Sequence, residues 1–115
     1  MTIYGINNCS TVKKALNWLN LNNIEYQFHD YKKLGIKQEI LQKWCDKFGW
    51  ENVLNKSGMM WRKADQQEKT KVTDKDSAIA FMMQIPSSIK RPIVEYKKGL
   101  LKGFDEKQYE KAFLK

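Results

Sequence analysis

The chain has 115 residues, of which 42% are hydrophobic and 30% charged, and its formal net charge at pH 7 is +8. This length and apolar share predict one globular domain with a core that needs no disulfide or structural metal. No run approaches the roughly 20 apolar residues of a membrane span, and the first residues lack the long apolar region of a signal peptide, so we expect a cytoplasmic protein. The lysines are scattered among Asp and Glu, which is typical of a solvated surface and does not favour dedicated nucleic-acid binding.

The first element predicted along the chain is a short strand that ends in Gly5 and a polar turn, followed by a helix. The apolar positions of this helix repeat at i, i+3, i+4 and i+7, and they are Val12, Ala15, Leu16 and Leu19. Asn8 is a good N-cap residue, so the pattern predicts a helix that begins at Cys9.

Cys9 would then lie in the first turn, where unpaired backbone N–H groups and the helix dipole favour negative charge. A cysteine in such a position can have a lowered pKa, and its thiolate is a nucleophile. The same N–H groups would suit an anionic substrate. The alternative interpretation is that Cys9 is a small residue that fills a corner of the core.

Apolar residues that alternate with polar ones predict a second strand over residues 24–29, with His29 on its polar side near the end. A helix that ends near Gly49 follows, and Cys45 shares its apolar face, so we expect Cys45 to serve core packing. Cys9 and Cys45 form neither a CxxC motif nor a metal-ligand cluster, and we expect no disulfide between them in a reducing compartment.

The residue pattern in the middle of the chain predicts further helices. We expect a short helix at 50–55, a segment at 59–62 after a Ser-Gly break, a polar and exposed stretch at 65–71, and a helix between Asp74 and Pro86. The Met82-Met83 pair in this helix is interpreted as core filling. The last elements predicted are a strand at 92–96, a turn at 97–99, a partner strand at 100–102 and a helix at 105–114.

Residues 4–15, Tyr-Gly-Ile-Asn-Asn-Cys-Ser-Thr-Val-Lys-Lys-Ala, resemble the active-site segment of the ArsC family, the glutaredoxin-type arsenate reductases, and of its YffB-like branch. Further similar segments follow in order at residues 28–33, 61–63, 89–93 and 103–106. The resemblance implies an α/β fold with a thioredoxin-like mixed sheet, β-α-β … β-β-α, and an inserted helical subdomain. Within one domain of residues 1–115, the thioredoxin-like part would comprise 1–32 and 87–115, and the helical insertion about 33–86.

The resemblance also implies an active site. Cys9 would be the catalytic nucleophile, Arg91 the substrate-binding arginine, and Pro92 the usually cis proline beside the cysteine. The alternative for Arg91 is a pair with a surface carboxylate. The remaining anion-binding candidates are Asn8, Ser10, Thr11, Lys56 and Arg62.

The chain departs from the family pattern where further arginines are expected. It carries Lys56 and Lys102 near those positions, and a lysine is a point charge without the bidentate fork of a guanidinium. Position 12 is Val, so Cys9 lacks the resolving cysteine of a CxxC motif. We therefore expect no bound cofactor or metal, and an external glutathione-like small thiol with a glutaredoxin- or thioredoxin-like donor as reductant.

Two other functions are compatible with the sequence. Spx-type regulators resemble this chain in size and order and bind RNA polymerase, with a CxxC as redox switch. This chain lacks the second cysteine of that CxxC motif, which argues against the switch. The Trp61-Arg62-Lys63 segment, which is present, fits the YffB-like branch better. The third interpretation is a protein of this fold whose Cys9 binds a ligand without turnover.

Overall fold

The computed structural model describes residues 1–114 and contains two compact units. The first unit comprises Met1–Asp30 and Arg91–Lys115, and the second comprises Tyr31–Lys90. Among the described residues, no helix is long and apolar enough to span a bilayer.

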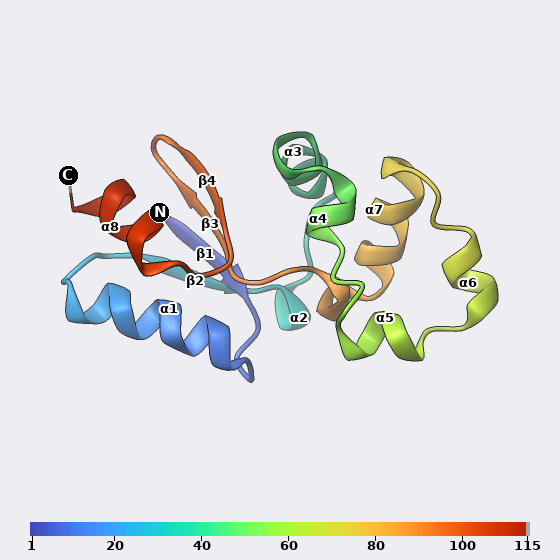
Figure 1. The fold of residues 1–115 in the computed structure, drawn as a ribbon, viewed down its shortest axis with the longest axis horizontal. Helices are drawn as coiled ribbons and strands as arrows, with labels where there is room; N and C mark the ends of the chain where they lie inside the picture. The colour runs from blue at the N-terminus through green and yellow to red at the C-terminus, as the bar shows by residue number, and fades with distance from the viewer. Residues whose placement is uncertain (115) are drawn as a thin grey trace. The chain divides into compact units, whose positions relative to one another are not determined.

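The first unit is built on a four-stranded sheet with the order β2-β1-β3-β4 (Figure 1). Its strands are β1 (Thr2–Gly5), β2 (Gln27–Asp30), β3 (Ile93–Tyr96) and β4 (Gly99–Lys102). Strand β1 is parallel to β2, and β3 is antiparallel to both β1 and β4. A parallel pair requires a crossover connection, which the helix α1 (Ser10–Leu21) provides, whereas β3 and β4 are joined by a tight turn.

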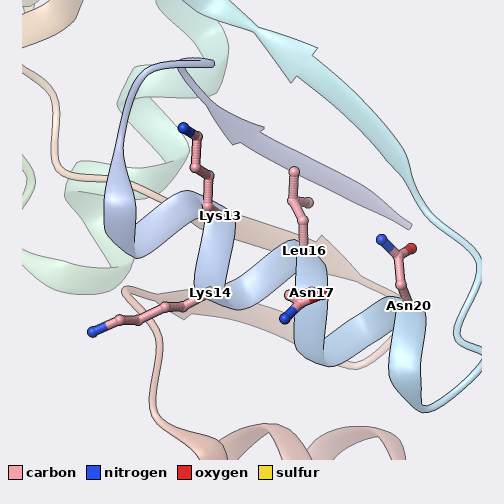
Figure 2. A pocket seen from close by; sticks show the side chains of 5 residues that line it. All are labelled: Lys13, Lys14, Leu16, Asn17 and Asn20. Atoms are coloured by element: carbon pink, nitrogen blue, oxygen red, sulfur yellow. The ribbon is translucent and has the colours of Figure 1, made fainter.

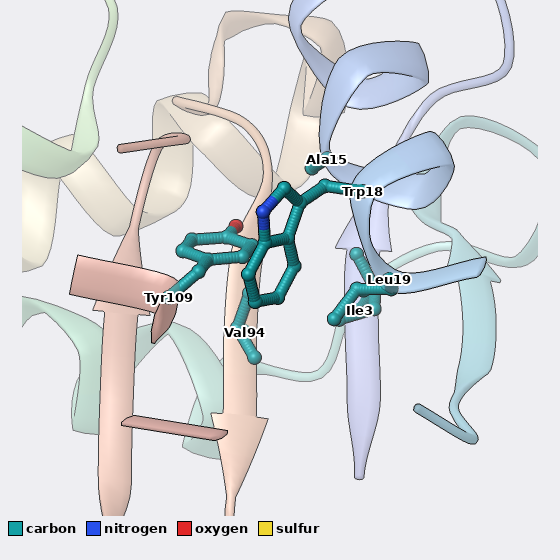
Figure 3. Close-up of a cluster of buried hydrophobic side chains, with 6 residues drawn as sticks. All are labelled: Ile3, Ala15, Trp18, Leu19, Val94 and Tyr109. Atoms are coloured by element: carbon teal, nitrogen blue, oxygen red, sulfur yellow. The ribbon is translucent and has the colours of Figure 1, made fainter. Parts of the chain in front are cut away.

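One face of this sheet is covered by α1 and the C-terminal helix α8 (Glu106–Phe113). Trp18 from α1 meets Tyr109 from α8 edge to face, with ring centroids 5.6 Å apart, above Val94 of β3 (Figure 3). The Tyr109 hydroxyl donates a 2.8 Å hydrogen bond to the Gly103 carbonyl, so this buried ring keeps a polar partner. The core therefore fixes α1, and with it the start of α1, on the sheet.

The second unit is helical. Its elements are α2 (Tyr31–Leu34), α3 (Gln38–Phe48), α4 (Trp50–Val53), α5 (Met59–Lys63), α6 (Gln66–Thr70), α7 (Lys75–Gln84) and the 3-10 helix η1 (Pro86–Ser88). Helix α7 begins with a capping box in which Asp74 and Ser77 satisfy each other's backbone N–H groups. The buried Tyr31 donates a 3.0 Å hydrogen bond to the Ile89 carbonyl, which ties the two ends of the unit together.

The predicted order of strand, helix, strand, a helical block, strand, strand and helix is confirmed, and so is the helix that buries Cys45. Helices α2, α6 and η1 were not predicted individually. Two predictions are wrong in detail. The second strand begins at Gln27, because the Ile24 N–H bonds the Leu19 carbonyl and completes the end of α1 before the chain can pair with β1. Met83 is 41% exposed although Met82 is fully buried, because adjacent residues of a helix point about 100° apart.

The predicted cap at Asn8 is also wrong. Cys9 has extended backbone angles, φ −138° and ψ 123°, and its carbonyl accepts the Lys13 N–H at 3.0 Å. Cys9 is therefore the N-cap residue and α1 begins at Ser10. The polar turn is one residue longer than the side-chain preference of Asn8 suggested, and that shift decides what the thiol faces.

Candidate functional site

Cys9 occupies the cap position of α1, immediately after the turn that follows β1. A side chain at an N-cap faces the backbone N–H groups two and three residues later, which here belong to Thr11 and Val12. The thiol is free and partly exposed, and it makes no capping hydrogen bond of regular geometry. Cys9 is thus accessible to a reagent and aimed at unpaired donors of the helix.

The environment of Cys9 favours the thiolate. Partial burial raises the pKa of the thiol, but hydrogen bonding from the Val12 N–H, the Arg91 side chain and the Thr11 N–H, with the positive charge of Arg91, outweighs burial. The pKa of Cys9 therefore lies below its ordinary value. The structure brings together a free thiol and two kinds of group that stabilise the negative charge of its thiolate.

Arg91 lies two residues before the start of β3, which lies beside β1 in the sheet. The Arg91–Pro92 peptide bond is cis, as the resemblance implies. Pro92 is buried, and its carbonyl accepts the Gly103 N–H at 2.7 Å. This hydrogen bond anchors the backbone next to Arg91 within the first unit.

The other cysteine lies in a very different environment. Cys45 is 4% exposed on α3, and burial, with the nearby Asp46 carboxylate, raises the pKa of its thiol to about 11 against the opposing charge of Lys75. Lys75 and Asp46 themselves form a 3.1 Å ion pair. Cys45 is therefore a core residue, whereas Cys9 is partly exposed and has a lowered pKa.

Of the remaining predicted anion-binding residues, Asn8, Ser10 and Thr11 are exposed around Cys9. Only the backbone N–H of Thr11 contributes to the lowered pKa of the thiol. Among residues 1–114 no cluster of His, Cys, Asp or Glu could hold a metal ion.

Sequence reasoning missed two features of the site. Val12 supplies a donor N–H, and no side-chain pattern could reveal it because the cap position itself was misplaced by one residue. The second is a pocket of about 400 Å³ on the solvent side of α1 (Figure 2). Its lining residues are Lys13, Lys14, Leu16, Asn17 and Asn20. Most of these residues are the polar positions of the predicted helix, and those positions could have indicated this surface.

The model of the ArsC family matches residues 4–112 of the chain. The chain belongs to the ArsC family. The matched region contains Cys9, Arg91 and Pro92.

Individual ArsC-like relatives cover almost the whole chain. An uncharacterised protein of Haemophilus influenzae is 43% identical over 113 residues, 98% of each chain. The solved structure of the YffB (PA3664) protein is 43% identical, covers 96% of each chain and superposes with a TM-score of 0.92. An arsenate reductase (ArsC) related protein from Brucella melitensis is also 43% identical, covering 99% of this chain and 93% of its own, with a TM-score of 0.74. The predicted thioredoxin-like α/β fold is confirmed.

Two predicted anion-binding residues of this ArsC-family chain, Lys56 and Arg62, belong to the second unit. Both are exposed. The Lys56 ammonium lies over two indole rings, 5.0 Å from the centroid of Trp50 and 5.9 Å from that of Trp61. Lys56 thus has aromatic partners inside its own unit.

Proposed function

We propose that this protein is a thiol-dependent reductase in which the Cys9 thiolate attacks the substrate. The observation that carries the proposal is the lowered pKa of Cys9 at the start of α1, where two backbone N–H groups and Arg91 favour negative charge. Membership of the ArsC family supports the same reaction class. A thiolate present near neutral pH is what nucleophilic attack on sulfur or arsenic requires.

For a mixed disulfide substrate, the Cys9 Sγ attacks one sulfur of the substrate. A Cys9–substrate disulfide forms, the original S–S bond breaks, and the departing thiolate takes a proton from solvent. Arg91 and the N-terminus of α1 stabilise the negative charge that moves between the sulfurs.

The cycle needs reducing equivalents from outside the chain. Position 12 is Val, which is buried, so Cys9 lacks the resolving cysteine of a CxxC motif. An external thiol of the glutathione type, or a protein thiol donor, must therefore attack the Cys9 mixed disulfide and release the Cys9 thiolate. No bound cofactor takes part in this scheme.

An oxyanion such as arsenate is the second substrate class for the same nucleophile. The thiolate would form a Cys9-bound arsenic adduct that external thiols reduce. The chain has arginine only at positions 62 and 91, and lysine stands near the positions where the family resemblance leads us to expect further arginines. Because a lysine cannot grip a tetrahedral oxyanion bidentately, we favour the mixed disulfide as substrate.

The test is a comparison of two substrates under identical conditions, a glutathione mixed disulfide and arsenate, with glutathione as reductant. We expect turnover of the disulfide by the unmodified protein and by Cys45→Ala, and none above background by Cys9→Ser. Arsenate turnover that exceeds disulfide turnover would reverse the substrate preference. Full activity in Cys9→Ser would overturn the proposal.

A further inference from the structure

The solvent face of α1 carries the pocket described above, close to Cys9 in the chain (Figure 2). Lys13 and Lys14 project from this face, and Asn17 and Asn20 continue it along the helix. Helix α1 contains no acidic residue. The face is therefore uniformly positive or neutral.

The two lysines do not serve the fold. Within residues 1–114, neither ammonium group lies in an ion pair or hydrogen bond, and both are exposed. They stand early in α1, the end of a helix where negative side chains are stabilising and positive ones are not. Their charge remains available to a ligand.

The length of the face indicates the size of its ligand. With a rise of about 1.5 Å per helical residue, Lys13 lies about 6 Å and Asn20 about 16 Å along the axis from Cys9. A fully extended tripeptide spans only about 10 Å. A small thiol bonded at Cys9 would not reach Asn20, whereas the surface of a protein would cover the whole face.

The far end of the face is ordered. The Tyr26 hydroxyl donates a 3.1 Å hydrogen bond to the Asn20 side-chain oxygen. The pocket also contains Leu16, a partly buried apolar residue between the lysines and Asn20. The face thus combines two unpaired cations, amide groups and an apolar centre on one rigid helix.

We propose that this face of α1 docks the acidic surface of a protein thiol donor, which reduces the mixed disulfide on Cys9. The inference rests on the proposed function, because that cycle requires an external thiol at Cys9. The occupant is a dithiol protein with carboxylates beside its reactive cysteine, since the face offers unpaired ammonium groups to carboxylates.

The donor thiolate attacks the substrate sulfur of the Cys9 mixed disulfide, a donor–substrate disulfide forms, and the electron pair of the broken S–S bond returns to the Cys9 sulfur. The donor's second thiol then displaces the substrate thiol, which leaves with a proton, and the donor departs as an intramolecular disulfide. The donor is oxidised by two electrons and the mixed disulfide is reduced by two.

The experiment starts from the full chain carrying glutathione on Cys9 and measures the second-order rate of its release. The probes are an acidic thioredoxin and the neutral small thiol 2-mercaptoethanol, each at low and high salt. The variant is Lys13→Glu/Lys14→Glu, and the matched control with the same change of charge is Lys97→Glu/Lys98→Glu in the β3–β4 turn, where both lysines are exposed.

We expect the α1 variant to slow release by the acidic thioredoxin at least about tenfold at low salt, with a weaker salt dependence. The control variant should change this rate by less than about twofold at 0.15 M salt, where distant charges are screened. Release by 2-mercaptoethanol should be nearly unchanged in both variants.

Three results would overturn the inference. Equal slowing by both double variants would mean that net charge alone acts. An unchanged rate in the α1 variant would mean that the donor docks elsewhere, although the proposed function would stand if both probes reduce Cys9. If neither probe releases glutathione from the unmodified chain faster than from a model peptide disulfide, the proposed function fails and the inference falls with it.

Discussion

Cys9 and Cys45 should differ greatly in their rates of alkylation. A thiol with a pKa of about 11, as for Cys45, is thiolate in only about one molecule in 3,000 at pH 7.5. A thiol with an ordinary pKa of 9.0 is thiolate in about one molecule in 30 at that pH, and Cys9 has a pKa below this value. Ionisation alone therefore predicts that Cys9 reacts at least about 100-fold faster than Cys45. The burial of Cys45 increases the difference further.

The assay is iodoacetamide alkylation of the folded protein, followed by peptide mass spectrometry at a series of pH values. The rate for Cys9 should level off at a lower pH than that of a model cysteine peptide. Cys9→Ser should remove the fast phase, and Cys45→Ala should leave it intact at a cost of about 1 to 2 kcal/mol in the free energy of unfolding. Comparable rates for the two thiols in the native protein would refute the electrostatic argument.

Other perturbations test separate parts of the structure. Arg91→Met should raise the pKa of Cys9, because it removes a hydrogen-bond donor and a positive charge, and the midpoint of the alkylation profile should move to higher pH; an unchanged midpoint would contradict this. The pKa of the Asp74 carboxyl is lowered by hydrogen bonds from Ser77, so its contribution to stability is present above the unfolded pKa of about 3.9 and is lost as pH falls through the folded value. The melting temperature of Asp74→Ala should accordingly lie below that of the unmodified protein at pH 7, and the difference should narrow as the pH falls below about 3.9; a constant gap would argue against the cap. Gly5→Ala would place a Cβ 2.9 Å from a methyl group of Val12, so we expect a loss of about 1 to 3 kcal/mol in urea unfolding, and a neutral effect would mean that β1 and α1 can move apart.

Hydrophobic periodicity predicted the succession of elements well. The i, i+3, i+4, i+7 pattern of α1 places Val12, Ala15 and Leu19 on the buried face as expected, because that spacing returns a residue to the same side of the helix. The same logic placed Cys45 in the core. The prediction for Met83 was wrong because periodicity does not show where the apolar face of a helix ends.

The details of the site depended on backbone geometry that residue types do not encode. Asn8 is the better N-cap by side-chain preference, yet Cys9 occupies the cap. This position aims the thiol at the N–H groups of Thr11 and Val12. The proximity of Arg91 is a long-range consequence of the pairing of β1 with β3, and the sequence supplied it only through family resemblance.

The most direct test of the central claim is the covalent intermediate itself. The native protein is mixed with a glutathione mixed disulfide in the absence of any other thiol, and its intact mass and peptide map are then measured. We predict one glutathionyl group per chain, located on Cys9, that disappears when an external thiol is added. A protein that remains unmodified, or that carries the group on Cys45, would contradict the account.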